Sequence, residues 1–229
     1  MTRDLHFCPQ CGTATLAGQK KMAADFADEG APMRRASYAL GVLFTGGVFS
    51  LILGAALEDD WGLTHIFMTG IGVMALWILG WPSREKILGG SFGAAALGLG
   101  LLSGAVCFGI NMAYANSINA LLDGELESWP SRWWTVVLLA PLVEEWLMRG
   151  VAWEAMLRIG NTRATILATS ALFALLHGLN GGAVLEFPHR FIGGLLLGWL
   201  RLRTGSIVPP ILAHLVVNAC AHFLFTDGA

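Results

Sequence analysis

Ionisable side chains occur inside apolar segments of this chain that are long enough to be membrane helices. Two acids and a base fall within the run Pro141-Leu142-Val143-Glu144-Glu145-Trp146-Leu147-Met148-Arg149-Gly150. Further along, His177, His214 and Asn218 stand among leucine, alanine and valine residues. A charged side chain at the centre of a bilayer costs at least about 2.5–3.5 kcal/mol on insertion scales, so it usually has a function. Carboxylates and imidazoles at one depth predict acid–base hydrolysis within a membrane.

Helical spacing gives different roles to the two neighbouring glutamates. Glu145 and Arg149 are four residues apart, so they share one face of a helix and are expected to form an ion pair. Glu144 is rotated from Glu145 by about 100° and falls outside that pair. We therefore predict that Glu145 is the structural partner of Arg149 and that Glu144, the freer carboxylate, is suited to be a general base. The structural alternative is a neutralised ion pair between helices with no role in catalysis.

Three separate helices are predicted to bring polar groups to one level. Counted from the basic residue at the end of each helix, Glu144, His177, His214 and Asn218 lie about 16–22 Å along their helices. Phe173 is four residues before His177, so its ring is expected to fix the imidazole. His214 and Asn218 have the same spacing and present two donors suited to an oxyanion. Either histidine alone would more often be a hydrogen-bonded packing residue.

Composition predicts an all-α fold, a polytopic membrane helix bundle. Hydrophobic residues make up 55% of the 229 positions and charged residues only 13%, about half the share usual in a soluble domain. The apolar blocks are long enough for about seven transmembrane helices, because one crossing needs about 20 residues. The fifth and sixth are short enough for one to be re-entrant. The predicted spans are 38–57, 61–81, 88–115, 133–157, 163–180, 187–202 and 206–225.

The charges between these spans alternate in sign. Following the positive-inside rule, we predict a multi-pass integral membrane protein, in the cell membrane if bacterial, with a cytoplasmic N-terminus and the C-terminus outside. Residues 1–36 form a predicted cytoplasmic tail, and residues 37–229 a transmembrane domain with its motifs in 141–218. A cleavable signal peptide is not expected, since the first apolar run begins late. The basic connections hold Arg34, Arg35, Arg84, Lys86, Arg158, Arg163, Arg201 and Arg203; the acidic ones hold Glu58, Asp59, Asp60, Asp123, Glu125 and Glu127.

The N-terminal tail contains half of a zinc-ribbon pattern. Cys8-Pro9-Gln10-Cys11-Gly12 resembles one knuckle, in which two thiolates bind one zinc ion. A structural zinc site needs four ligands, and a second such cysteine pair is absent from the sequence. His6 or a second copy of the chain would have to supply the remainder. A degenerate knuckle in a flexible tail is the favoured interpretation.

Small residues and the other histidines are given structural interpretations. Gly100 and Gly104, and likewise Gly194 and Gly198, have the four-residue spacing that lets membrane helices pack closely. The remaining histidines of the spans stand near predicted span ends and are assigned to interfaces or loops. They are His65, His189 and His222.

The ordered motifs Glu-Glu-x-x-x-Arg, Phe-x-x-x-His and His-x-x-x-Asn resemble those of the CAAX protease and bacteriocin-processing family of glutamic-type intramembrane endopeptidases. The resemblance covers roughly residues 130–225, and Gly205-Ser206-Ile207 before the last motif agrees with it. It implies hydrolysis of a peptide bond in a membrane-associated or lipidated protein or peptide. By that resemblance, Glu144 activates water, His177 helps to hold it, and His214 and Asn218 stabilise the oxyanion, while Glu145, Arg149 and Phe173 brace the site.

The resemblance leaves alternatives for the mechanism and the class of protein. Members of this family have also been described as zinc metalloproteases, but a His-Glu-x-x-His pair is absent here and the last motif offers an asparagine, so we expect no metal and no cofactor. A transporter also keeps charges at mid-membrane, although the repeated halves of many transporters are not evident. A non-catalytic immunity or scaffold protein would tolerate loss of motif residues. The expected partners are a peptide or protein substrate and the lipid bilayer, with no nucleic acid.

Overall fold

The computed structural model describes residues 16–57, 62–90, 92–122, 132–178 and 183–225. These residues are almost entirely helical, in agreement with the predicted all-α class. Two of the elements, η1 and η2, are π-helical. In chain order the elements are α1 (Leu16–Ala56), α2 (Gly62–Ile78), α3 (Arg84–Leu88), α4 (Ala94–Leu122), η1 (Thr135–Leu139), α5 (Ala140–Glu145), η2 (Trp146–Ala152), α6 (Trp153–Leu157), α7 (Thr162–Gly178), α8 (Ala183–Thr204) and α9 (Val208–Phe225).

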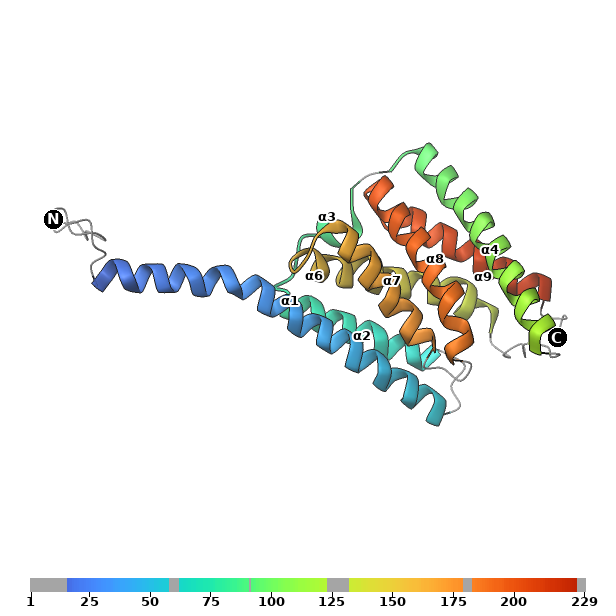
Figure 1. Cartoon of the computed structure of the whole chain (residues 1–229), viewed down its shortest axis with the longest axis horizontal. Helices are drawn as coiled ribbons and strands as arrows, with labels where there is room; N and C mark the ends of the chain where they lie inside the picture. The colour runs from blue at the N-terminus through green and yellow to red at the C-terminus, as the bar shows by residue number, and fades with distance from the viewer. Residues whose placement is uncertain (1–15, 58–61, 91, 123–131, 179–182, 226–229) are drawn as a thin grey trace.

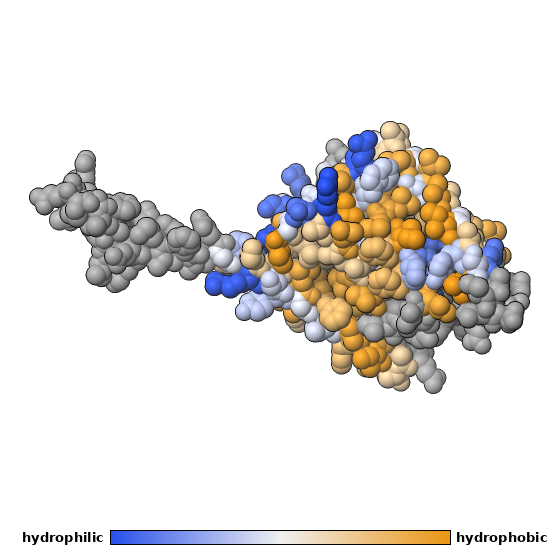
Figure 2. All heavy atoms as spheres, viewed as in Figure 1, coloured by the Kyte–Doolittle hydropathy of each residue, from blue (hydrophilic) through white to orange (hydrophobic). Residues whose placement is uncertain are grey.

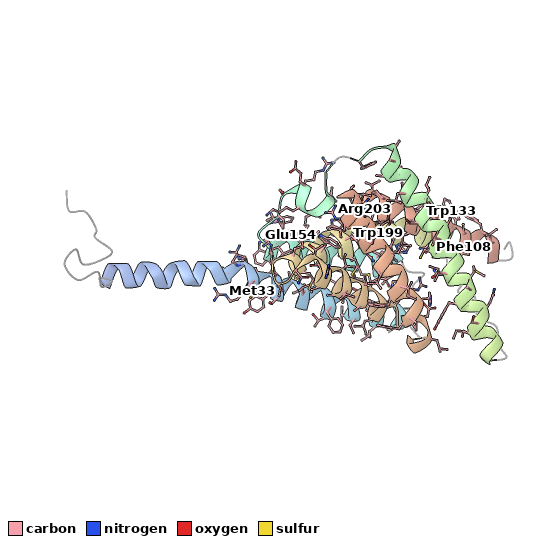
Figure 3. All side chains as sticks on the ribbon, turned by 45° about the horizontal axis from the view of Figure 1, so that its top comes forward. Met33, Phe108, Trp133, Glu154, Trp199 and Arg203 are labelled. Atoms are coloured by element: carbon pink, nitrogen blue, oxygen red, sulfur yellow. The ribbon has the colours of Figure 1, made fainter. Side chains whose placement is uncertain are left out.

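The helices form three groups that lie side by side (Figure 1). The hairpin of α1 and α2 lies at one side, and α4 packs along α9 at the other. Between them lie α7 and α8 together with the continuous run from η1 to α6. Met33 lies close to where α1 meets the other helices (Figure 3). The motif residues therefore come from elements in the middle and the α9 side of the bundle.

The outside of this bundle is apolar. Figure 2 shows hydrophobic residues over most of the visible face of the helical body. Among the described residues, two helical stretches are long and apolar enough to cross a membrane, Gly30–Ala56 and Ala94–Ile118. Much of their surface faces outward: Ile52 is 63% exposed and Leu102 is likewise 63% exposed. Such a surface would be unstable in water and fits contact with lipid acyl chains.

Each predicted span overlaps a helical part of the chain, with three differences at the boundaries. The span predicted at 38–57 is the second part of α1, which already begins at Leu16 within the predicted tail. The span predicted from residue 88 begins at Ala94, because α3 is a separate short helix. The span at 133–157 is a run of π- and α-helical segments. The count of seven membrane crossings stays a prediction, and Cys8 and Cys11 lie outside the described residues.

Glycines allow the close helix contacts that their spacing predicts. A Cβ atom on Gly104 would lie 2.7 Å from the carbonyl oxygen of Ala213, so α4 and α9 approach each other almost backbone to backbone. A Cβ atom on Gly194 would lie 3.0 Å from the Cα atom of Ser170, between α8 and α7. Helix packing in lipid depends on such contacts because the apolar side chains gain little by leaving lipid for protein. These contacts hold the two histidine helices in place.

Pro141 and Asn218 together account for the irregular start of the glutamate helix. In η1, the N–H of Ala140 donates to the carbonyl of Thr135, five residues back. The next bond of this π-type ladder would join Pro141 to the carbonyl of Val136, but proline has no N–H to donate. Nδ2 of Asn218 donates to the Val136 carbonyl instead, at 2.9 Å. A side chain of α9 thus replaces a missing backbone donor beside the glutamate motif.

Arg201 fixes the connection into the last histidine helix. Its guanidinium donates to the carbonyls of Lys86, Leu88 and Gly205. The N–H of Ile207 donates to Leu88 O at 3.0 Å, so the segment that precedes α9 is tied to the end of α3. The depth of α9, and hence of its histidine, is set by these bonds.

Candidate active site

The carboxylate of Glu144 faces imidazoles from separate helices. Its Oε2 atom lies 3.6 Å from Nε2 of His177 on α7 and 3.8 Å from Nε2 of His214 on α9. Its Oε1 atom lies 3.5 Å from Nε2 of His65 on α2. Glu144 is only 16% exposed, so the whole cluster is largely removed from solvent. The structure therefore brings together Glu144, His177 and His214, three of the four residues that were predicted to share one depth.

In both motif histidines, the ring nitrogen that does not face Glu144 makes a hydrogen bond, and this bond defines the tautomer. Nδ1 of His177 is 2.9 Å from the carbonyl oxygen of Phe173. Nδ1 of His214 is 3.0 Å from Oε1 of Glu145. Because a carbonyl and an ionised carboxylate only accept, we assign the proton to Nδ1 in both rings. In the neutral rings the lone pairs on Nε2 then point toward Glu144.

Glu145 and Arg149 form the predicted ion pair, and both are completely buried. Nη1 of Arg149 donates to Oε1 of Glu145 at 3.1 Å. Nη2 of Arg149 donates to the carbonyl of Gly194 on α8 at 2.9 Å. Since Glu145 also accepts from His214, the pair joins α8, the glutamate helix and α9. Breaking it would leave a buried charge without compensation, which makes the pair a rigid support.

The ring of Phe173 packs against the two motif imidazoles and the guanidinium of Arg149. Its ring centroid lies 4.4 Å from that of His177 and 5.8 Å from that of His214. The guanidinium carbon of Arg149 lies 5.0 Å from the same centroid, in a cation–π position. One buried ring therefore limits the movement of two imidazoles and of the bracing arginine.

Asn218 has a different environment from the one its motif suggests. Its amide donates to Val136 O, as described above, and this contact supports the backbone of η1. An amide carries two N–H donors, so this bond uses only one of them. Its predicted role as an oxyanion donor requires the second N–H and stays a prediction.

The prediction for His65 was wrong. We assigned it to an interface or loop at a span end, whereas it is 3% exposed and contacts the Glu144 carboxylate. A single histidine four residues into α2 forms no motif with its sequence neighbours, so the sequence contains no signal for this contact. Only the packing of α2 against the glutamate helix reveals it.

An open, mainly apolar pocket leads to Glu144. One wall comes from α1 and α2, and the other from α5, η2 and α7. Its polar groups are Glu144, His65 and His177, which lie close to one another where the two walls meet. The apolar lining consists of Leu43, Gly47, Leu51, Met68, Ile71, Leu147, Met148, Phe173 and Leu176. This combination suits a ligand whose apolar groups contact the lining while one of its polar groups lies at the Glu144 carboxylate.

Comparison with known proteins gives one match. Residues 127–220 match the family model described as Type II CAAX prenyl endopeptidase Rce1-like. No curated protein and no solved structure matches the chain. The matched residues include Glu144, His177 and His214, and the family indicates a membrane-embedded endopeptidase that acts on a protein or peptide. Residues 127–220 are therefore similar to an Rce1-like domain, and this match agrees with the CAAX protease family that the three sequence motifs predicted.

Proposed function

We propose that this chain is an intramembrane endopeptidase in which Glu144 activates the water that hydrolyses a peptide bond. The observation that carries the proposal is the position of the Glu144 carboxylate, between the Nε2 atoms of His177 and His214 and against an apolar pocket. Separations of 3.6 and 3.8 Å exceed those of direct hydrogen bonds. They suit a water molecule that donates to Glu144 and is held by an imidazole.

In this mechanism Glu144 takes a proton from the water as its oxygen attacks the substrate carbonyl. The carbonyl oxygen becomes an oxyanion, which His214 and the second N–H of Asn218 stabilise. His214 donates from Nε2 only when its ring is protonated, and the Glu145 carboxylate on its Nδ1 supplies the negative charge which that form requires. Glu144 then passes its proton to the nitrogen of the leaving peptide, and the C–N bond breaks.

The substrate class follows from the pocket and from the apolar exterior. A pocket lined mainly by leucine and other apolar side chains favours a membrane-associated or lipidated protein or peptide. Basic residues at the ends of several helices lie together, which supports the assignment of that side of the bundle to the cytoplasm. Arg158 donates to the carbonyl of Leu79, and Arg201 donates to the carbonyl of Lys86. We accordingly propose a multi-pass membrane protein with its N-terminus in the cytoplasm.

A zinc-dependent reaction is the alternative, because histidine nitrogens and a carboxylate are also zinc ligands. Glu144, His177 and His214 would then hold the ion. A variant lacking residues 1–15 removes Cys8 and Cys11, so that zinc in the tail is not mistaken for zinc in the site. We expect this variant to cleave substrate at the same rate with and without a chelator. Stoichiometric zinc, loss of activity on chelation and recovery with metal would establish the alternative.

The class of protein is tested by comparing two activities of the purified chain. In liposomes, we expect cleavage of a membrane-anchored peptide, read by mass spectrometry, and no flux of protons or ions. Ion flux without cleavage would instead support a transporter. Membrane proteomes of cells with and without the protein would then identify the natural substrate by its shortened form.

A further inference from the structure

The two carboxylate oxygens of Glu144 have different surroundings. Oε2 faces His177 and His214, where the proposed water binds. Oε1 faces Nε2 of His65, 3.5 Å away, on a helix that carries none of the sequence motifs. A carboxylate held only through Oε2 would be able to turn about its last torsion, which is broad for glutamate. His65 Nε2 lies 3.5 Å from Oε1, at the outer limit of a hydrogen bond, and this polar contact restricts that rotation.

We propose that His65 is a positioning residue of this protease, which holds Oε1 of Glu144 so that Oε2 is directed at the water. The inference rests on the proposed function, in which Glu144 is the base. His65 itself neither touches the water nor takes the proton in this scheme. Its contribution is to the orientation of the base, on which the rate of the chemical step depends.

The packing of α2 supports this role. Beside His65, Thr64 lies directly against Gly54 of α1, where a Cβ atom would collide with the Thr64 hydroxyl. Thr64 is 2% exposed and His65 is 3% exposed, so this turn of α2 is enclosed by neighbouring helices. Such enclosure limits the rotamers open to the imidazole.

Two further contacts hold α2 along the glutamate helix. A Cβ atom on Gly72 would lie 2.6 Å from Cδ2 of Leu147, so the two helices approach closely at this glycine. At the far end, Arg158 donates to the carbonyl of Leu79 at 2.9 Å. Leu79 and Arg158 each lie 14 residues beyond His65 and Glu144, respectively, so the two helices run in the same direction. The histidine is therefore supported by a long rigid contact and not by a loop.

Three substitutions of His65 separate positioning from packing. In glutamine the amide nitrogen occupies nearly the place of Nε2, and in asparagine nearly that of Nδ1, while leucine has no polar group. Because Nε2 faces Glu144, we expect His65→Gln to retain most of the activity. His65→Asn and His65→Leu should lower kcat about tenfold to hundredfold, the usual effect of losing an orienting partner, with KM unchanged. His222→Gln, at the end of α9, is the matched control and should behave as the native protein.

Equal kcat values for the glutamine, asparagine and leucine variants would overturn the proposal, and so would an effect confined to KM. A second measurement reads the contact without activity. In detergent, the unfolding temperature is compared for His65→Leu, for Glu144→Leu, which has no oxygen to face His65, and for the double variant. We expect the losses of the single variants to be non-additive, because both remove the same contact. Additive losses of unfolding temperature would refute the contact, even if the protein cleaves substrate. Non-additive losses in a protein that cleaves no substrate would leave the contact in place and refute only the proposed function.

Discussion

The buried pair of Glu145 and Arg149 allows the most quantitative prediction. Both side chains are 0% exposed, and Arg149 also binds the carbonyl of Gly194. Replacing Arg149 by methionine keeps most of the side-chain volume but leaves the Glu145 carboxylate without its guanidinium. Removing one partner of a buried pair costs about 3–5 kcal/mol. For a chain of this size, that corresponds to a fall in unfolding temperature of about 6–20 °C.

The double variant distinguishes a pair from two independent residues. In Glu145→Gln the amide oxygen can still accept from His214, while Arg149 loses its charge partner. Combining Glu145→Gln with Arg149→Met removes both charges together, so we expect a loss smaller than the sum of the two single losses. The nine tryptophans of the chain provide a fluorescence signal for thermal unfolding in detergent.

Glu186 and Arg190 on α8 are the matched control, because they have the same four-residue spacing. Their carboxylate and guanidinium are 3.0 Å apart but 39% and 28% exposed. Exposed pairs of this kind contribute about 0.3–0.5 kcal/mol, so Glu186→Gln should change the unfolding temperature by at most about 2 °C. Fully additive losses at Glu145 and Arg149, or losses no larger than in this control, would refute the bracing role.

Three further predictions test the site and its support. Asn218→Ala should lower the cleavage rate about 10²–10³-fold if its second N–H stabilises the oxyanion. The variant also loses the hydrogen bond to Val136 O, so the rate is compared at equal amounts of folded protein. A smaller fall in rate would contradict the oxyanion role. Gly104→Val should lower the unfolding temperature, because its Cβ atom would lie 2.7 Å from Ala213 O, and an unchanged temperature would show that α4 and α9 are not tightly packed. Gly47→Leu should raise KM more than it lowers kcat, since its Cβ atom would lie 3.0 Å from Cδ2 of Leu176 and the added side chain would crowd the pocket wall. An unchanged KM would show that substrate binds elsewhere.

Contacts within one helix could be predicted from the sequence because helical spacing fixes them. The pairing of Glu145 with Arg149 follows from their four-residue separation. The packing of the Phe173 ring beside the His177 ring follows in the same way. The contact of Glu144 with the two motif histidines could be predicted because all three lie at a similar depth. That depth can be counted along each apolar span from the basic residue at its end.

The remaining features depend on contacts between helices or on local backbone chemistry. The π-helical start of the glutamate helix arises where Pro141 removes a donor and Asn218 supplies one from α9, a combination far apart in the sequence. The position of His65 depends on how α2 packs, through Thr64 against Gly54 and through Gly72. Neither contact leaves a periodic pattern along the chain.

Cleavage by Glu144→Gln is the most direct test of the proposed mechanism. The amide keeps the shape of the side chain but cannot accept a proton from water, so the base is lost while the contacts around it largely remain. The rate of cleavage of a membrane-anchored peptide would be measured for this variant and for Glu186→Gln, at equal amounts of folded protein. We predict that the Glu186→Gln variant cleaves at the native rate and that Glu144→Gln loses at least about 10²–10⁴-fold in rate. Near-native turnover by a folded Glu144→Gln variant would contradict the assignment of Glu144 as the general base.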